Sequence, residues 1–230
     1  MAAPDLFHSL STNELKKEIG KIVSKDTRSL PDKAKVFSAI ASIQKFDLLP
    51  DVTEFAKLSE LVAAGHKELN RGITATRGVP AMFYVKELLL GPMYPGTLSS
   101  LGNGIYLAST QASEKKLPDT FPSISQIAIK YANGDEGGIV VRCALKPDAK
   151  VMEYDGLKDF CRDNRNRARE AGLGDMGAIA AALGYDAYFR EQIERDINEI
   201  VWVVVNRNAL TFQRQVLQYA PKAVYSGATK

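Results

Sequence analysis

The order of strand-like and helix-like patterns is the feature of this 230-residue sequence that most restricts its fold. Short apolar runs typical of strands are interrupted by isolated helical segments, without a regular strand-helix alternation. Regular alternation would favour a parallel sheet covered by helices on both faces, whereas this irregular order predicts an α+β domain. The expected strands lie at residues 68–74, 105–108, 138–145, 150–154, 185–189, 199–205 and 211–217.

The first 68 residues favour helices. Ser11 begins a capping-box signature followed by apolar residues at helical spacing. A second helix is predicted to begin at Pro31, and a third after Asp51. We therefore expect residues 1–68 to form a helical N-terminal lobe, within the same globular unit as a domain spanning residues 69–230.

Composition narrows the classes of function. Hydrophobic residues make up 45% and charged residues 25%, which is typical of an ordinary globular protein. The longest apolar runs fall well short of the ~20 residues of a membrane span, and the N-terminus has no secretory signal pattern. With a net charge of +3, binding to nucleic acid is not expected. The basic run at residues 162–169 is interpreted as a solvated helix face, with an acidic partner or RNA as the alternative.

The cysteines and histidines do not form a metal-ligand pattern. Cys143 lies in an expected strand and Cys161 in an expected helix, and their spacing fits neither a zinc site nor a disulfide framework. His8 and His66 are far apart in the sequence and lack acidic or cysteine neighbours at ligand spacing. We therefore predict reduced thiols and no metal site.

Residues 101–111 read Leu-Gly-Asn-Gly-Ile-Tyr-Leu-Ala-Ser-Thr-Gln. The two glycines permit a tight turn, and the apolar residues 105–108 then predict a short buried strand. Ser109 and Thr110 place hydroxyls at the end of that strand. This pattern is a candidate ligand loop, and a simple hairpin turn is the alternative.

Two further segments accompany this stretch in a definite order. Arg71 and Gly72 belong to the first expected strand, and Glu199 opens an apolar run near the end of the chain. An arginine-glycine, a Gly-x-Gly-x-Tyr strand with a trailing serine, and a glutamate opening a late strand resemble the ADP-ribosyltransferase superfamily. The likeness extends over residues 69–213 and is greatest to bacterial and phage-borne members, with features shared by the poly(ADP-ribose) polymerase catalytic domain. It implies split antiparallel sheets around an NAD cleft.

The resemblance also implies roles for individual residues. Glu199 would stabilise the oxocarbenium-like charge on the ribose of NAD as nicotinamide leaves. Arg71 would bind the pyrophosphate or the adjoining ribose, and Ser109 would orient Glu199. The tyrosines would enclose the nicotinamide ring, and Gly72 would meet its carboxamide. The expected catalytic residues are Glu199, Arg71 and Ser109, and the expected NAD-binding residues are Arg71, Gly72, Gly104, Tyr106, Ser109, Thr110 and Tyr131.

Simpler explanations exist for several of these residues. Glu199 is alternatively a solvated carboxylate at a strand edge, with Glu194 as the second candidate for the catalytic carboxylate. Arg71 is alternatively a surface ion-pair partner, and Tyr131 a tyrosine that packs in the core.

The resemblance implies a mono-ADP-ribosyltransferase of effector, toxin or phage type, which moves ADP-ribose from NAD to a macromolecule, expected to be a host protein. Ile197 stands where arginine-modifying members commonly carry Glu or Gln, so arginine modification is not supported. An NAD glycohydrolase, a non-catalytic NAD-binding module on the same fold, and a structural protein remain as alternatives. The expected location is the cytoplasm, or a host cytoplasm reached without a signal peptide.

Overall fold

The computed structural model describes residues 3–27, 29–46, 51–74, 80–90, 101–110, 124–132, 137–194 and 197–219. The helices of this part of the chain are α1 (Leu6–Ser9), α2 (Thr12–Val23), α3 (Asp32–Ile43), α4 (Phe55–Ala63), α5 (Ala81–Leu90), α6 (Gln126–Ala132), α7 (Tyr154–Asp163), α8 (Arg165–Glu170), α9 (Met176–Ala182) and the 3-10 turn η1 (Arg207–Ala209). The strands are β1 (Asp51–Thr53), β2 (Lys67–Thr74), β3 (Ile105–Thr110), β4 (Gly138–Leu145), β5 (Val151–Glu153), β6 (Ala187–Glu194), β7 (Ile197–Val204), β8 (Leu210–Gln213) and β9 (Leu217–Tyr219).

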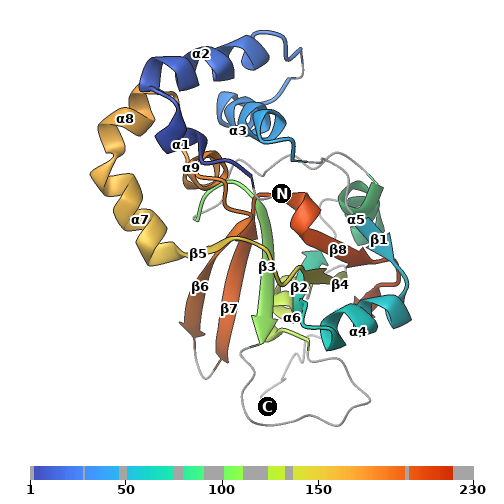
Figure 1. Ribbon diagram of the computed structural model, residues 1–230. Helices are drawn as coiled ribbons and strands as arrows, with labels where there is room; N and C mark the ends of the chain where they lie inside the picture. The colour runs from blue at the N-terminus through green and yellow to red at the C-terminus, as the bar shows by residue number, and fades with distance from the viewer. Residues whose placement is uncertain are drawn as a thin grey trace, which may run out of the picture.

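These strands form one mixed sheet in the order β1-β8-β4-β2-β3-β7-β6-β5, with β9 pairing to β4 (Figure 1). The pairs β1–β8 and β5–β6 are parallel, and the other pairs are antiparallel. Because helices and strands do not alternate regularly along the chain, the protein is α+β, as the sequence pattern predicts.

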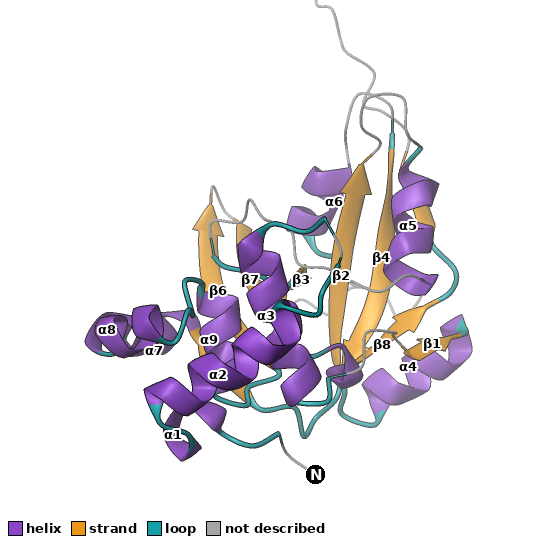
Figure 2. Cartoon of the chain, turned by 90° about the horizontal axis from the view of Figure 1, so that it is seen from above, coloured by secondary structure: helices purple, strands orange, loops and turns teal. Residues whose placement is uncertain are grey.

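The pairing between β2 and β3 involves fewer described residues than the pairing between any other neighbouring strands of the sheet. Strand β2 pairs with β4 along its whole length, and β3 does the same with β7. Between β2 and β3, however, the described residues form one registered pair, Asn70 with Ala108. Figure 2 shows the two halves on either side of β3, with β2, β4 and β8 in one and β6 and β7 in the other. We refer to this narrow contact as the β2–β3 junction.

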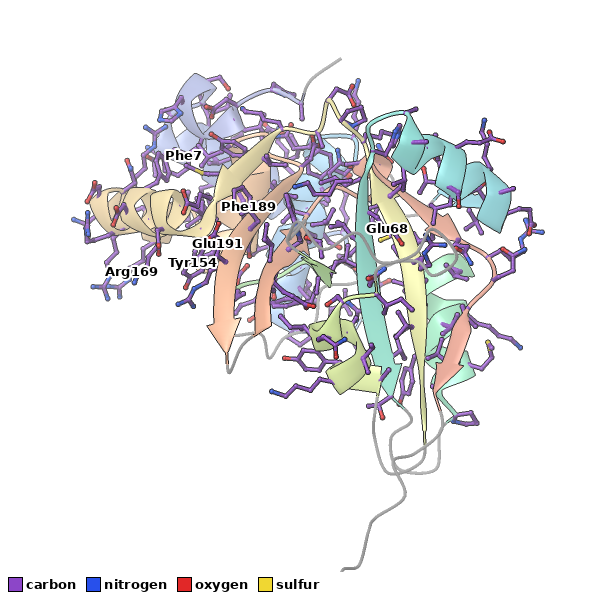
Figure 3. The ribbon with its side chains drawn as sticks, turned by 90° about the horizontal axis from the view of Figure 1, so that it is seen from below. Phe7, Glu68, Tyr154, Arg169, Phe189 and Glu191 are labelled. Carbon is purple, nitrogen blue, oxygen red and sulfur yellow. The ribbon has the colours of Figure 1, made fainter. Side chains whose placement is uncertain are left out.

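Each face of the sheet packs against its own hydrophobic core. Val203 of β7 belongs to a core shared with α1, α2, α3, α7, α8 and α9. The preceding residue, Trp202, belongs to a core shared with α5 and the strands of the other half. Successive strand residues point to opposite faces, so the two cores lie on opposite sides of the sheet. In the first core, Phe7, which is labelled in Figure 3, packs edge-on against Phe160, with 5.2 Å between ring centroids.

The N-terminal region differs from the expected three-helix lobe. Helices α2 and α3 form as predicted, and Ser11 caps α2 through the expected box with Glu14. Residues 51–53, however, form strand β1 beside β8, and α4 begins after them and packs near β4 and β8. Val52 contacts the second core, and this tertiary contact overrides the local helical signal. Residues 1–68 therefore contribute to both halves of the molecule.

Helix α6 lies directly on β2 and β4. A Cβ atom built on Gly72 would be 1.9 Å from the carbonyl oxygen of Ala128, and one built on Gly138 would be 1.7 Å from that of Ala132. Glycine at both positions lets the helix backbone approach the two strands closely. This approach positions the first turn of α6 beside the β2–β3 junction.

Candidate functional site

The carboxylate of Glu199 joins β7 to the first turn of α6. Glu199 is 3% exposed. Its Oε2 atom accepts from the Ser125 hydroxyl at 2.5 Å and from the Ile127 N–H at 3.0 Å, while Oε1 accepts from the Gln126 N–H at 2.6 Å. The first N–H groups of a helix lack partners within the helix, and a carboxylate there is electrostatically favoured. Glu199 therefore caps α6 from a strand that is distant in the sequence.

Among the described residues, this capping leaves the carboxylate with one further acceptor position. A carboxylate offers about four lone-pair sites, two on each oxygen. The contacts with α6 use both sites on Oε2 and one on Oε1. A hydroxyl group brought to Oε1 of Glu199 could therefore donate to it without displacing α6.

Asn70 also holds the start of α6, although the sequence patterns did not single it out. Its side chain is 1% exposed, and Oδ1 accepts from the Ser125 N–H at 2.8 Å. Its Nδ2 atom has no hydrogen-bond partner among the described residues. A polar residue at a buried position of an otherwise ordinary strand is the only sequence signal that would have pointed to it.

Several predicted site residues share one face of the sheet at the β2–β3 junction. Asn70 pairs with Ala108, so their side chains point to the same face. Gly72 and Tyr106 lie two residues from this pair and therefore occupy that face as well. Glu199 pairs with Thr110, which is two residues after Ala108, so its carboxylate is on the same face. The side chain of Thr110 lies outside the described part.

The ring of Tyr106 spans from this face to the preceding turn. Its hydroxyl donates to the carbonyl oxygen of Gly102 at 2.8 Å and accepts from the Leu101 N–H at 3.0 Å. Gly102 has φ +108°, in a region that favours glycine. A Cβ on Gly104 would lie 2.5 Å from Cγ1 of Val203. Gly104, an expected NAD-binding residue, is thus packed against β7.

Asp175 secures this turn, and its replacement gives a first testable prediction. Its Oδ1 atom accepts from the N–H groups of Gly177 and Ala178, which cap α9, and from that of Asn103. Asp175→Ala is expected to lower the free energy of unfolding by about 1 to 2 kcal/mol, because the cap is lost. Urea denaturation measures this change. The exposed Asp148, replaced in the same way, is the control and should change it by less than about 0.5 kcal/mol. Equal effects for both variants would contradict the cap.

Arg71 lies at the junction itself. It leaves β2 on the face opposite Asn70 and Gly72, because neighbouring strand residues alternate. Its Nη1 atom donates to the carbonyl oxygen of Tyr106 at 3.0 Å, which bridges β2 and β3 beyond their last registered pair. Burial lowers the pKa of the guanidinium. Arg71 and Glu199 therefore emerge on opposite faces rather than side by side.

Ser109 does not contact Glu199, contrary to the expected orienting role. It pairs with Ile200, on the face opposite Glu199, and its hydroxyl accepts from Nε1 of Trp202 at 3.0 Å. The hydroxyl that contacts Glu199 belongs to Ser125. The register between β3 and β7 decides this exchange of roles, since a shift of one residue reverses the face.

Tyr131 is an exposed side chain. It lies on α6 with 68% of its surface exposed, so it is not the core tyrosine considered as the alternative. Ile127, four residues earlier and hence on the same side of the helix, packs against Ala108 and Val201. Tyr131 thus projects from the side of α6 that faces β3 and β7. Glu194 ends β6, and its side chain lies outside the described residues.

The cysteines are unsuited to act as nucleophiles. Burial raises the pKa of Cys161 to about 11 and also raises that of Cys143. Both cysteines are free thiols. Because burial raises their pKa values, they stay protonated near neutral pH. Within the described ranges, no group of three or more His, Cys, Asp or Glu side chains could hold a metal ion. In the same ranges, each helix is too short or too polar to cross a bilayer.

Comparisons with protein-family models, curated proteins and solved structures found no match to this chain. The class of the protein therefore rests on its own geometry: an α+β fold with a buried, helix-capping glutamate beside a sheet junction one residue pair wide.

Proposed function

We propose that this protein is a mono-ADP-ribosyltransferase that binds NAD on the face of the β2–β3 junction carrying Glu199. The observation that supports the proposal most is the buried Glu199 carboxylate, which accepts from the Ser125 hydroxyl and the first two N–H groups of α6 and, among the described residues, keeps one acceptor position open. Gly72 and Tyr106 lie on the same face. A fixed negative charge beside an aromatic ring suits a cationic nicotinamide riboside.

The reaction breaks the bond between the ribose C1′ atom and the nicotinamide nitrogen. Nicotinamide leaves with the bonding electron pair, and positive charge develops on the sugar. Glu199 would stabilise that charge and accept a hydrogen bond from a ribose hydroxyl through Oε1. A nucleophile of the acceptor protein then bonds to C1′ and loses its proton. Because α6 holds the carboxylate in place, little reorganisation is needed as the charge develops.

The remaining residues would position the two ends of NAD. Tyr106 and Tyr131 would flank the nicotinamide ring. Tyr106 packs beside Ala108 and Ile127, and Tyr131 is exposed one turn further along α6. Gly72 would meet the carboxamide through its backbone.

Arg71 leaves β2 on the opposite face, but its guanidinium reaches the backbone of β3 at the junction. There it would exchange its bond to the Tyr106 carbonyl oxygen for a phosphate oxygen of NAD lying across the edge of the junction, with which it forms a stronger, charge-assisted pair.

Incubation of the protein with host lysate and NAD labelled in the adenylate moiety tests this function. Label transferred to lysate protein is expected, and it should be absent with Glu199→Gln. Release of free ADP-ribose alone would identify an NAD glycohydrolase instead. Binding of NAD without turnover would identify a non-catalytic module, and absence of NAD binding in calorimetry would overturn the proposal.

Arg71→Lys is expected to weaken NAD binding although the charge is kept. The lysine ammonium cannot reproduce the planar, multi-donor contact of guanidinium with phosphate. A loss of about tenfold in affinity corresponds to roughly 1.4 kcal/mol, which is typical of one charge-assisted bond. Titration calorimetry measures the affinity, with Arg162→Lys at an exposed position of α7 as the control. Equal affinities for both variants would remove Arg71 from the site.

A further inference from the structure

The side-chain amide of Asn70 has a hydrogen bond at its oxygen, and its nitrogen has no partner among the described residues. Because the Ser125 N–H requires an acceptor, the oxygen of the amide must face Ser125, which also determines where Nδ2 points. Asn70 is 1% exposed, and Nδ2 lacks a partner among the described residues. Leaving a buried donor unpaired costs about 1 to 3 kcal/mol, so such groups call for a specific explanation.

Asn70 and Glu199 hold the same residue. The Ser125 hydroxyl donates to Glu199 at 2.5 Å, and the Ser125 N–H donates to Asn70 at 2.8 Å. Around this shared residue, and among the described residues, Asn70 keeps an unused donor and Glu199 an unused acceptor position. A pair of neighbouring hydroxyls can satisfy both, since a hydroxyl donates and accepts.

The path of α6 decides which part of NAD would meet Asn70. Ser125, the residue before the helix, lies beside Asn70 and Glu199, and α6 reaches Gly72 three residues later through Ala128. Gly72 would take the carboxamide under the proposed function. The group beside Asn70 is thus the sugar, at which Glu199 acts.

We propose that Asn70 is a ribose-binding residue. One hydroxyl of the nicotinamide-side ribose donates to Oε1 of Glu199, and Nδ2 of Asn70 donates to the oxygen of the neighbouring hydroxyl. The inference rests on the proposed function, and it adds a contact that selects ligands with an intact ribose diol. No bond is made or broken in this contact.

Calorimetry with an uncleavable C-nucleoside analogue of NAD tests the contact. Wild-type protein is titrated with the full analogue and with its 2′-deoxy and 3′-deoxy forms on the nicotinamide side. Loss of the hydroxyl bound by Asn70 should weaken binding to wild type about tenfold, or roughly 1.4 kcal/mol. In Asn70→Ala, the same deoxygenation should change affinity by less than about twofold, because the donor is already gone.

A purely structural role gives a different result. If Asn70 only anchors α6 through Ser125, Asn70→Ala weakens all three analogues equally and keeps the sensitivity to both deoxygenations, which overturns the proposal. Asn103→Ala is the matched control, because Asn103 is 3% exposed and its Nδ2 also lacks a partner among the described residues. This variant should retain the wild-type sensitivity.

A measurement on wild-type protein avoids any folding defect of the variants. The side-chain amide signals of Asn70 in a nitrogen-proton correlation spectrum should shift on addition of the full analogue, and clearly less with the deoxy form that lost the contact. Unchanged signals under saturating analogue overturn the ribose contact alone. Wild-type protein that binds neither the analogue nor NAD instead overturns the proposed function.

Discussion

Glu199→Gln is expected to lower the turnover of NAD by about 100-fold to 1000-fold, or roughly 2.7 to 4 kcal/mol, the loss typical of removing one electrostatic stabiliser from an active site. The substitution keeps the shape of the side chain and removes the charge opposite the developing oxocarbenium. Affinity for NAD should change much less, because the charge acts mainly in the transition state. Single-turnover kinetics and calorimetry on the same protein measure the two quantities.

The capping role of Glu199 adds an effect on stability. The Gln126 and Ile127 N–H groups donate to different oxygens of Glu199, and glutamine keeps one oxygen, so its amide nitrogen leaves one of these N–H groups without an acceptor. Glu199→Gln should therefore lower the free energy of unfolding by about 1 to 3 kcal/mol. Ser125→Ala is the matched control, since it removes two hydrogen bonds at the start of α6, one to Glu199 and one from the Ala128 N–H, and keeps the carboxylate. It should lower stability similarly and turnover much less.

Two outcomes would contradict the assignment of Glu199. Turnover that falls equally in Ser125→Ala and Glu199→Gln would mean that the order of α6, rather than the charge, is needed. A large loss of turnover in Glu194→Gln, with Glu199→Gln unaffected, would move the catalytic role to Glu194. Glu191→Gln, at an exposed position of β6 labelled in Figure 3, should leave turnover unchanged.

Gly72→Ala is expected to lower the free energy of unfolding by about 1 to 3 kcal/mol. The new Cβ would meet the carbonyl oxygen of Ala128 at 1.9 Å, and backbone atoms of a packed helix cannot move aside as a flexible side chain can. Gly138→Ala, which meets Ala132 at 1.7 Å, should have a similar effect. Urea denaturation measures both changes.

Gly20→Ala is the control for these glycine substitutions. Gly20 lies inside α2, and an added Cβ would have no neighbour within 4 Å. Alanine there should stabilise the protein by about 0.5 to 1 kcal/mol, because glycine loses more backbone freedom in a helix. Destabilisation by Gly72→Ala together with stabilisation by Gly20→Ala would support the close packing of α6 on β2 and β4. Stabilisation by both substitutions would contradict it.

The sequence predicts those parts of the fold that local patterns determine. The capping box at Ser11 and the strand containing Arg71 both form as expected. Strand β1 was missed because three residues carry too little periodicity, and it forms through its pairing with β8 and the contact of Val52 with the core. Long-range pairing of this kind has no local signature.

The candidate site shows the same division. The sequence located the strand positions of Gly72, Tyr106 and Glu199, which the sheet brings to one face. The sequence analysis predicted that Ser109 contacts Glu199, whereas the hydroxyl that does so belongs to Ser125. This error arose because the face on which a strand residue lies depends on the register between distant segments. The sequence patterns also missed Asn70, whose significance comes from burial and from an unpaired donor that only the folded chain reveals.

The structural role of Glu199, beside its proposed catalytic role, has a consequence for the evolution of this protein. A descendant that lost the proposed activity would remain under selection to keep Glu199, because without it the start of α6 would lose its cap. Tyr131 experiences little of that structural selection, since 68% of its surface is exposed. An inactive descendant should therefore retain the glutamate and lose the tyrosine first. The tyrosine is thus the better marker for distinguishing active from inactive members of such a lineage.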